Sequence, residues 1–105
     1  MPVSAVNTFR LRPGVTAVQF ERFSADLDRP TCLAFDVVLG FEVYLVDGDG
    51  ADVVEIMTVS SWPEWERVRD SAPELKPVVE KFGELVQPDS VTTLLTRKSP
   101  LPQEI

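Results

Sequence analysis

One carboxylate stands inside an apolar segment of this sequence. Residues 53–59 read VVEIMTV, a β-branched and apolar run typical of a sheet strand, and Glu55 is its single charged residue. A carboxylate that loses hydration in such surroundings has a raised pKa, which brings it toward the useful range of a general base. Glu55 is therefore the first candidate catalytic residue. The alternative is a structural glutamate that pairs with Arg10 or Arg97 on a neighbouring strand, or that lies at a dimer interface.

Three further residues are catalytic candidates beside Glu55. Asn7 lies in the first expected strand, which should neighbour residues 53–59, and its amide could orient a substrate carbonyl. Tyr44 could donate a proton or stack on a flat ring, and Asp28 could face the mouth of a pocket. The alternatives are a satisfied core amide, a packed tyrosine and a turn residue at a helix end.

Four residues are candidates for substrate binding. Phe41 and Met57 carry large apolar side chains on the expected strands, and Trp62 could stack on an aromatic ring, although core packing is the alternative for it. Asp36 interrupts an apolar connection and could lie over a pocket. Cys32 has no histidine to activate it, so we expect it to be a buried apolar residue.

The composition excludes several kinds of site. The 105 residues include no histidine, which removes Ser–His and Cys–His pairs and zinc sites built from cysteine and histidine. The five glycines fall singly or in turns and form no phosphate-binding loop. We therefore expect no metal and no redox cofactor. Acid–base chemistry falls to carboxylates, the single tyrosine, lysine or the single cysteine.

Charge and hydropathy bear on partners and location. The formal net charge of −7 disfavours nucleic acid and anionic membranes as partners, because both require a positive surface. No apolar run approaches ~18 residues, and residues 1–6 lack the features of a signal peptide. With one cysteine there is no intrachain disulfide. We expect a cytoplasmic protein with one domain over residues 1–97 and a loose tail over residues 98–105.

Four strands should position these residues, over residues 1–12, 40–47, 53–59 and 90–96. The sequence Asp47-Gly48-Asp49-Gly50 predicts a hairpin turn between the second and third strands. It lacks the downstream glutamate of a calcium loop. The conformation of residues 31–38 stays open.

Two helical segments separate the strands. The first should begin after Thr16, with Gln19 as its capping-box partner, and end at Asp28-Arg29-Pro30, because the residue before a proline avoids the helical region. The second should begin at Ser61, with Glu64 as the capping-box partner. It should break near Pro73 and resume over about residues 77–86.

The resulting order β-α-β-β-α-β predicts an α+β, ferredoxin-like fold with both helices on one face of an antiparallel sheet. Residues 40–47 and 53–59 carry large apolar side chains on both faces, Tyr44 and Met57 among them, and residues 53–59 should be buried on both. An uncovered apolar sheet face usually marks an interface. We therefore expect a homodimer whose sheets pack face to face.

The order and spacing of several short motifs also carry a family resemblance. They are Arg10-Leu11-Arg12-Pro13-Gly14-Val15, Asp28-Arg29-Pro30-Thr31, Gly40-Phe41-Glu42-Val43-Tyr44 and Val54-Glu55. With them, residues 3–97 resemble the RedY-like group of the dimeric α+β barrel proteins, found in prodiginine and bisindole biosynthesis. Leu45 departs from the basic residue expected there in many relatives. The resemblance implies a homodimer, a pocket between sheet and helices, and small aromatic natural-product intermediates, without metal, flavin or nicotinamide.

Three functions stay open at this point. The first is a cofactor-independent cyclase or condensation-type enzyme acting on a pyrrole- or indole-derived intermediate, with Glu55 as base and Tyr44 or Asn7 as polar partner. The second is a non-catalytic binding module that sequesters a reactive aromatic intermediate or supports another enzyme of the same pathway. The third is a cofactor-free monooxygenase, which would need a substrate that activates oxygen itself.

Overall fold

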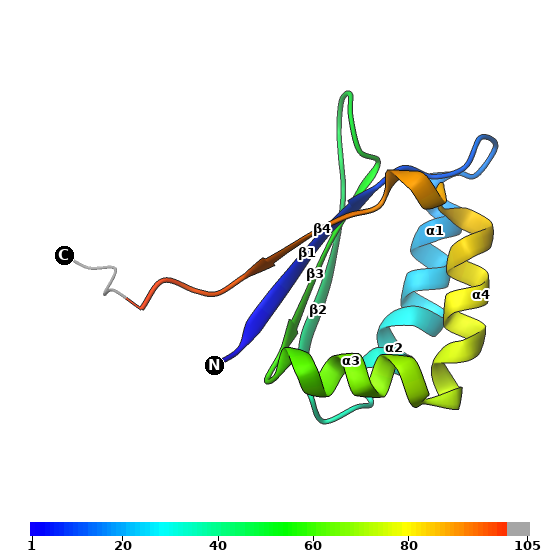
Figure 1. Cartoon of the computed structure of the whole chain (residues 1–105). Helices are drawn as coiled ribbons and strands as arrows, with labels where there is room; N and C mark the ends of the chain where they lie inside the picture. Colours follow the sequence, from blue (N-terminus) through cyan, green and yellow to red (C-terminus); the bar gives the residue numbers. More distant parts are fainter. Residues whose placement is uncertain (101–105) are drawn as a thin grey trace.

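Four antiparallel strands form one sheet in this computed structural model, which describes residues 1–100 (Figure 1). The strands are β1 (Val3–Phe9), β2 (Val38–Leu45), β3 (Val53–Val59) and β4 (Thr92–Thr96), in the spatial order β2-β3-β1-β4. Every neighbouring pair is antiparallel. The predicted β-α-β-β-α-β order of the ferredoxin-like fold is therefore confirmed.

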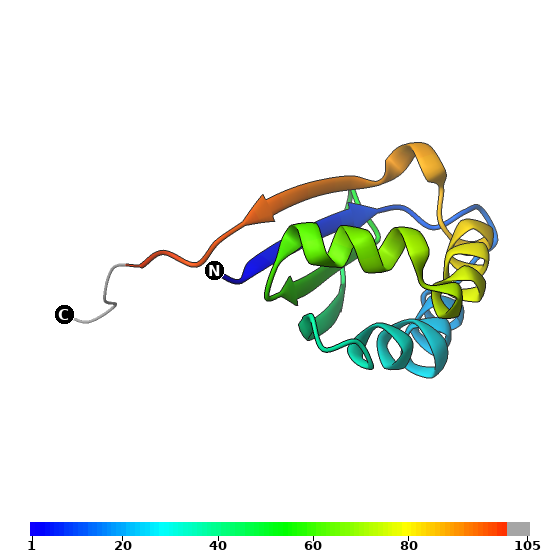
Figure 2. The same cartoon turned by 60° about the horizontal axis from the view of Figure 1, so that its bottom comes forward.

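The helices lie together on one face of this sheet (Figures 1 and 2). They are α1 (Ala17–Phe23), the π-helical turn η1 (Ser24–Asp28), α2 (Arg29–Leu33), α3 (Trp62–Ser71) and α4 (Lys76–Leu85), with the 3-10 turns η2 (Pro73–Leu75) and η3 (Pro88–Ser90). The predicted break near Pro73 is present as η2. No helix within residues 1–100 is long and apolar enough to cross a membrane.

The first helix does not end where the sequence predicts, because a π turn carries it past Pro30. The backbone N–H of Arg29 bonds to the carbonyl of Ser24, five residues earlier instead of four. Pro30 lies in the first turn of α2, and Arg29 before it keeps helical dihedrals, with φ −64° and ψ −46°, although the residue before a proline usually avoids them. The expected stop at Asp28-Arg29-Pro30 is therefore wrong, and the undecided segment 31–38 begins as helix and ends as the start of β2.

The β3 strand has the predicted bounds but not the predicted burial on both faces. Its residues alternate between buried and half-buried, and Val53, Met57 and Val59 face the helices. The other face, with Val54 and Ile56, is only half-buried because no helix covers it. The expectation of two buried faces is thus wrong for the single chain.

The β2–β3 connection is the predicted hairpin turn. Gly48 and Gly50 have φ angles of 103° and 100°, which side chains larger than hydrogen disfavour. The turn closes through the bond from the Val46 N–H to the Asp52 carbonyl, at 3.0 Å.

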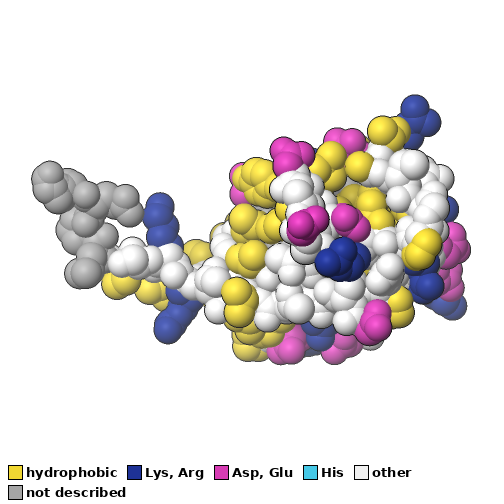
Figure 3. Space-filling model, turned by 90° about the horizontal axis from the view of Figure 1, so that it is seen from above, with side chains coloured by type: hydrophobic (Ala, Val, Ile, Leu, Met, Phe, Trp, Pro, Cys, Tyr) yellow, Lys and Arg dark blue, Asp and Glu magenta, His cyan; other side chains and the backbone are white. Residues whose placement is uncertain are grey.

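On the end of the molecule that Figure 3 shows, acidic side chains lie beside hydrophobic ones, and basic ones are scattered.

The core between sheet and helices centres on four phenylalanine rings. Phe9 on β1 meets Phe20 of α1 and Phe82 of α4 edge to face, with ring centroids 5.4 and 5.2 Å apart. Phe20 meets Phe23 at 5.7 Å. Such pairs add ~0.5–1.5 kcal/mol each beyond the area that they bury. This aromatic cluster ties α1 and α4 to the C-terminal end of β1.

The chain leaves this body after β4. Figure 1 shows the segment that follows β4 leading away from the sheet, and residues 97–100 carry no helix or strand. The rest of the tail predicted over residues 98–105 lies outside the described residues.

Ser61 caps α3 through its side chain, which accepts a hydrogen bond from the Glu64 N–H at 3.3 Å. Ser61→Ala should lower the free energy of unfolding by about 1 kcal/mol, because that N–H loses its acceptor. Ser60→Ala is the matched control, since Ser60 is exposed and its side chain makes no hydrogen bond within residues 1–100. Urea unfolding measures both. Equal stability of the two variants would contradict a stabilising cap.

Candidate functional site

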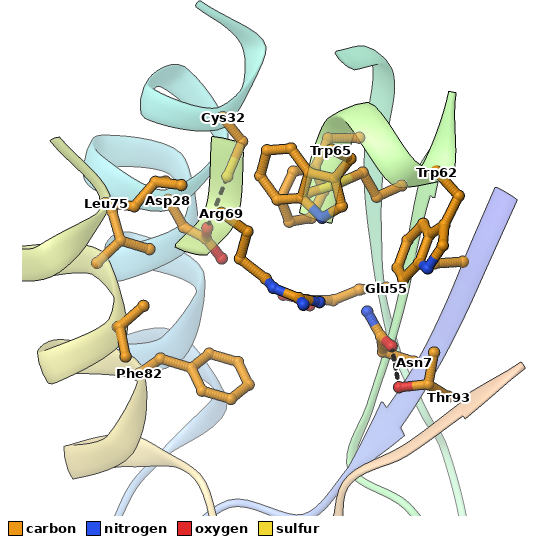
Figure 4. Close-up of a pocket in the computed structure, with 15 residues that line it drawn as sticks. Asn7, Asp28, Cys32, Glu55, Trp62, Trp65, Arg69, Leu75, Phe82 and Thr93 are labelled. Carbon is orange, nitrogen blue, oxygen red and sulfur yellow. Dashed lines mark hydrogen bonds between the residues drawn. The ribbon is translucent and has the colours of Figure 1, made fainter. Parts of the chain in front are cut away.

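A cavity of about 440 Å³ lies between the helix-facing side of the sheet and the helices (Figure 4). Its wall is mostly apolar and aromatic, with two carboxylates and one guanidinium. The lining residues are Ala5, Asn7, Asp28, Cys32, Phe41, Glu55, Met57, Trp62, Trp65, Arg69, Leu75, Val78, Val79, Phe82 and Thr93. The size and the apolar wall with a few polar groups are typical of a small-molecule site.

Glu55 enters this cavity from the sheet. It lies in the middle of β3, with Asn7 opposite it on β1 and Val43 opposite it on β2, and only 5% of its surface is exposed. Its Oε2 has no hydrogen-bond partner in the described part of the chain. Within residues 1–100, no ion pair joins Glu55 to Arg10 or to any other basic residue. The ion-pair alternative is therefore not supported, and Glu55 faces the helices instead of the uncovered sheet face.

Asp28 enters the cavity from the helical layer. It is the last residue of the π turn, and 5% of its surface is exposed. The Cys32 thiol, one turn further along the helix, donates a hydrogen bond to Asp28 Oδ1 at 3.5 Å. Asp28 is thus a buried residue of a continuous helical segment and not a helix-end turn residue. The π turn matters here because it changes which side of the helix faces the cavity after Ser24.

Burial raises the pKa of both carboxyl groups. The pKa of Glu55 rises to about 8, mainly through loss of hydration and further through the negative charge of Asp28, with Arg29 opposing. The pKa of Asp28 rises to about 6 through loss of hydration, while the Cys32 hydrogen bond and Arg29 oppose the rise. Burial, followed by the charge of Asp28, raises the pKa of the Cys32 thiol, so it stays protonated as a donor. At neutral pH one carboxyl is therefore mainly protonated and the other mainly ionised.

Asn7 lies beside Glu55, as the expected strand pairing required. The Thr93 hydroxyl on β4 donates a hydrogen bond to Asn7 Oδ1 at 2.7 Å, which fixes the orientation of the amide. Figure 4 shows the amide nitrogen turned toward Glu55. This nitrogen is available as a donor to a group held next to the carboxyl.

The four substrate-binding candidates and the remaining catalytic candidate, Tyr44, divide between the cavity and the surface. Phe41, Met57 and Trp62 line the cavity, as expected for an aromatic ligand. Tyr44 does not, because it projects from the opposite face of β2 with 50% of its surface exposed. Asp36 is exposed in the turn between α2 and β2 and does not line the cavity either.

Three polar residues of the cavity were not among the predicted site residues: Arg69, Thr93 and Cys32, the last of which was expected only to be a buried apolar residue. Arg69 follows Trp62 by seven residues and Trp65 by four, so helical spacing alone puts the three on one face of α3. Cys32 follows Asp28 by four residues, but the expected helix stop hid that relation. Within residues 1–100, no three histidine, cysteine, aspartate or glutamate side chains gather into a possible metal site.

The raised pKa of Glu55 makes the stability of the fold depend on pH. The unfolded chain releases this proton near pH 4.5 and the folded chain near pH 8, so rising pH favours unfolding between these values. Glu55→Gln removes this penalty. The melting temperature of Glu55→Gln minus that of the wild type should therefore grow from pH 4.5 to pH 8 and then level off. Calorimetry at matched ionic strength measures it.

Glu42→Gln is the control, because Glu42 lies on β2 with an exposed side chain. Its melting temperature should track that of the wild type across the same range. A difference for Glu55→Gln that shrinks as pH rises would contradict the buried, unpaired carboxyl.

Solved structures share the fold of the whole chain. HapK from Hahella chejuensis has a TM-score of 0.81 at 16% identity, over 98% of both chains. A dimeric protein of unknown function with a ferredoxin-like fold from Bacteroides fragilis has a TM-score of 0.70 at 16% identity, over 92% of this chain and 96% of that one. A dimeric ferredoxin-like protein from Thermobifida fusca has a TM-score of 0.71 at 11% identity, over 91% and 90%.

No curated protein sequence matches this chain. The family model described as REDY-like protein HapK matches residues 3–98, nearly the same span over which the sequence motifs carry the RedY-like resemblance. With that match and the shared fold, the chain belongs to the REDY-like HapK family.

Proposed function

We propose that this protein is a cofactor-independent proton-transfer enzyme that promotes cyclisation or condensation of a flat intermediate derived from pyrrole or indole in a natural-product pathway. One observation carries the proposal: Glu55 and Asp28 line the same apolar cavity from opposite layers, without an ion-pair partner in residues 1–100. Glu55 Oε2 lacks any hydrogen-bond partner there. A buried polar atom of this kind is satisfied when a ligand donates to it.

The two carboxyl groups divide the acid and base roles. Since the pKa of Asp28 is about 6 and that of Glu55 about 8, Asp28 is the base and Glu55 the acid near pH 7. This assignment differs from the sequence-based expectation of Glu55 as base. Asp28 accepts a proton from an acidic carbon or nitrogen of the ligand, and Glu55 donates its proton to the position that gains electron density. The amide of Asn7 donates to a ligand carbonyl.

The wall of the cavity supports an aromatic ligand. Trp62, Trp65 and Phe82 offer ring faces and edges, and Phe41 and Met57 add apolar surface from the sheet. These groups hold a flat molecule by dispersion and by exclusion of water, which strengthens the electrostatic effect of the carboxyl pair. Tyr44 and Asp36 have no part in this mechanism, since they lie outside the cavity.

The binding-module alternative rests on the same cavity, so proton transfer itself must be measured. Indol-3-ylacetone is a suitable probe, because its CH₂ group lies between an indole ring and a carbonyl. In D₂O near pH 7 the wild type should speed deuterium incorporation at this carbon. Asp28→Asn and Glu55→Gln should each slow it by ~10²–10⁴-fold, the usual contribution of one positioned acid or base. The rate should fall below pH 6 and above pH 8, as ¹H NMR can follow.

Asp36→Asn is the control, because this exposed carboxylate lies outside the cavity. This variant should catalyse deuterium incorporation into indol-3-ylacetone at the wild-type rate. Binding of the ketone with exchange no faster than in buffer would rule out the enzyme for this carbon acid and favour a binding module.

We also propose that two copies pack through the uncovered sheet face. Because Asn7 and Glu55 point into the cavity, Val6 and Ile56 point the other way, and Leu94 lies beside Val6 on β4. With Tyr44 and Val54 they form an apolar band across the sheet, in which Leu94 is 67% exposed. Structural neighbours that are dimeric ferredoxin-like proteins support this assembly.

Leu94→Asp should turn the dimer into monomers, because it puts a charge into the apolar contact. Light scattering at micromolar concentration measures the mass. Val18→Asp is the control, since Val18 is also exposed, at 57%, but lies on α1 in the helical layer. A monomeric wild type would contradict the assembly.

A further inference from the structure

Arg69 is the one lysine or arginine among the residues that line the cavity. It lies on α3, one turn after Trp65, and its side chain is 42% exposed. Figure 4 shows it extending toward the middle of the cavity, between Asp28 and Asn7 in that view. An arginine at the opening of a largely apolar cavity is placed to meet a ligand before the deeper carboxyl groups do.

The guanidinium is only loosely held by its own helix. Its Nε donates to Asp70 Oδ1 at 3.1 Å, and its Nη2 lies 3.8 Å from Glu66 Oε2. Its Nη1 makes no hydrogen bond or ion pair within the described residues. Exposed pairs of this kind contribute little to stability because solvent screens them, so a ligand can replace them at little cost.

We propose that Arg69 is a specificity-determining residue that binds an anionic oxygen group of the ligand, such as a carboxylate. This inference rests on the proposed function, and it adds a charged end to the flat aromatic ligand. The carboxylate lies at the opening against Arg69, and the ring lies deeper among Trp62, Trp65 and Phe82. The acidic hydrogen then points toward Asp28 and Glu55.

Charge balance supports this orientation. The cavity carries two carboxyl groups, so an anionic ligand entering in the reverse sense would bring its charge against Asp28. Guanidinium matches a carboxylate with two parallel N–H donors, which a neutral ligand cannot exploit as fully. Arg69 therefore selects both for an acidic group and for one direction of entry.

Indole-3-acetate and indole-3-acetamide test this inference, because they share ring and length and differ in charge. By calorimetric titration at pH 7 and low salt, the wild type should bind the acetate on the order of tenfold more tightly than the amide. Arg69→Gln should reduce this ratio to about one and leave the affinity for the amide unchanged. Arg69→Lys should keep part of the preference, since it retains the charge without the paired donors.

Arg67→Gln is the matched control. Arg67 lies on the same helix and forms an ion pair with Glu64, but its side chain is 66% exposed and it does not line the cavity. It should keep the wild-type ratio, which separates a local contact at Arg69 from the general effect of losing one positive charge.

The outcomes separate this inference from the proposed function. Equal affinity of the wild type for both probes, or an equal loss in Arg67→Gln and Arg69→Gln, overturns the role of Arg69. If indol-3-ylacetone still exchanges its protons in that case, the enzyme proposal stands. A clear acetate preference that depends on Arg69, without any exchange of the ketone, supports Arg69 and overturns the enzyme. Failure of the wild type to bind either probe at millimolar concentration overturns the inference.

Discussion

Two carboxyl groups are buried in one apolar cavity, and the rest of the structure has to offset the free energy of hydration that they lose. Neither Glu55 nor Asp28 has an ion-pair partner in the described chain, and the charge of Asp28 disfavours ionisation of Glu55. Such a site persists only if the surrounding fold is rigid enough to prevent collapse or hydration. The phenylalanine cluster and the three-strand pairing around Glu55 supply this rigidity.

The division between layers explains why the site needs the whole fold. β1, β3 and β4 contribute Asn7, Glu55 and Thr93, and these three come together through strand pairing alone. Asp28 comes from the opposite layer and depends on the packing of the helices. A change that loosens the contact between layers therefore alters the coupling of the two carboxyl groups before it unfolds the protein. The contacts between sheet and helices therefore determine both the arrangement of the groups in the cavity and the stability of the fold.

Periodicity and capping signals were sufficient to predict the element order. The strand at residues 53–59, the Ser61 cap and the aspartate–glycine turn each depend on near neighbours in sequence, and all three are present, although the expected burial of both strand faces is wrong. The first and third strands were correctly expected to be neighbours, because strand order follows from the topology, and Asn7 lies opposite Glu55. Tyr44 could not be assigned to a face of the sheet by its own sequence. Which face the helices cover depends on packing between distant segments, and the local sequence pattern carries no information about that packing.

The misjudged helix has a different cause. A proline after Asp28-Arg29 signals a stop under the usual rule, because its ring crowds the residue before it and disfavours helical dihedrals there. Arg29 nevertheless keeps helical dihedrals, with φ −64° and ψ −46°, and the helix continues through a bond over five residues to Ser24 that no residue type in that stretch announces. For this reason the Asp28–Cys32 contact, a simple pair one turn apart, was out of reach until the helix was seen to continue.

The π turn also divides this helical segment into two stretches, whose inward-facing residues follow different phases of the helical repeat. Phe20 and Phe23 face the core in the phase of α1, whereas Asp28 and Cys32 face the cavity in the phase that starts with α2. Because a π turn holds one extra residue over nearly the same rise, a relative with one residue fewer there could keep the helix and lose only the turn. Alignments of this segment are therefore safest when they are anchored separately on Thr16 and on Pro30. With a relative that has one residue fewer, a single ungapped alignment across this turn would assign the position of Asp28 to the wrong residue.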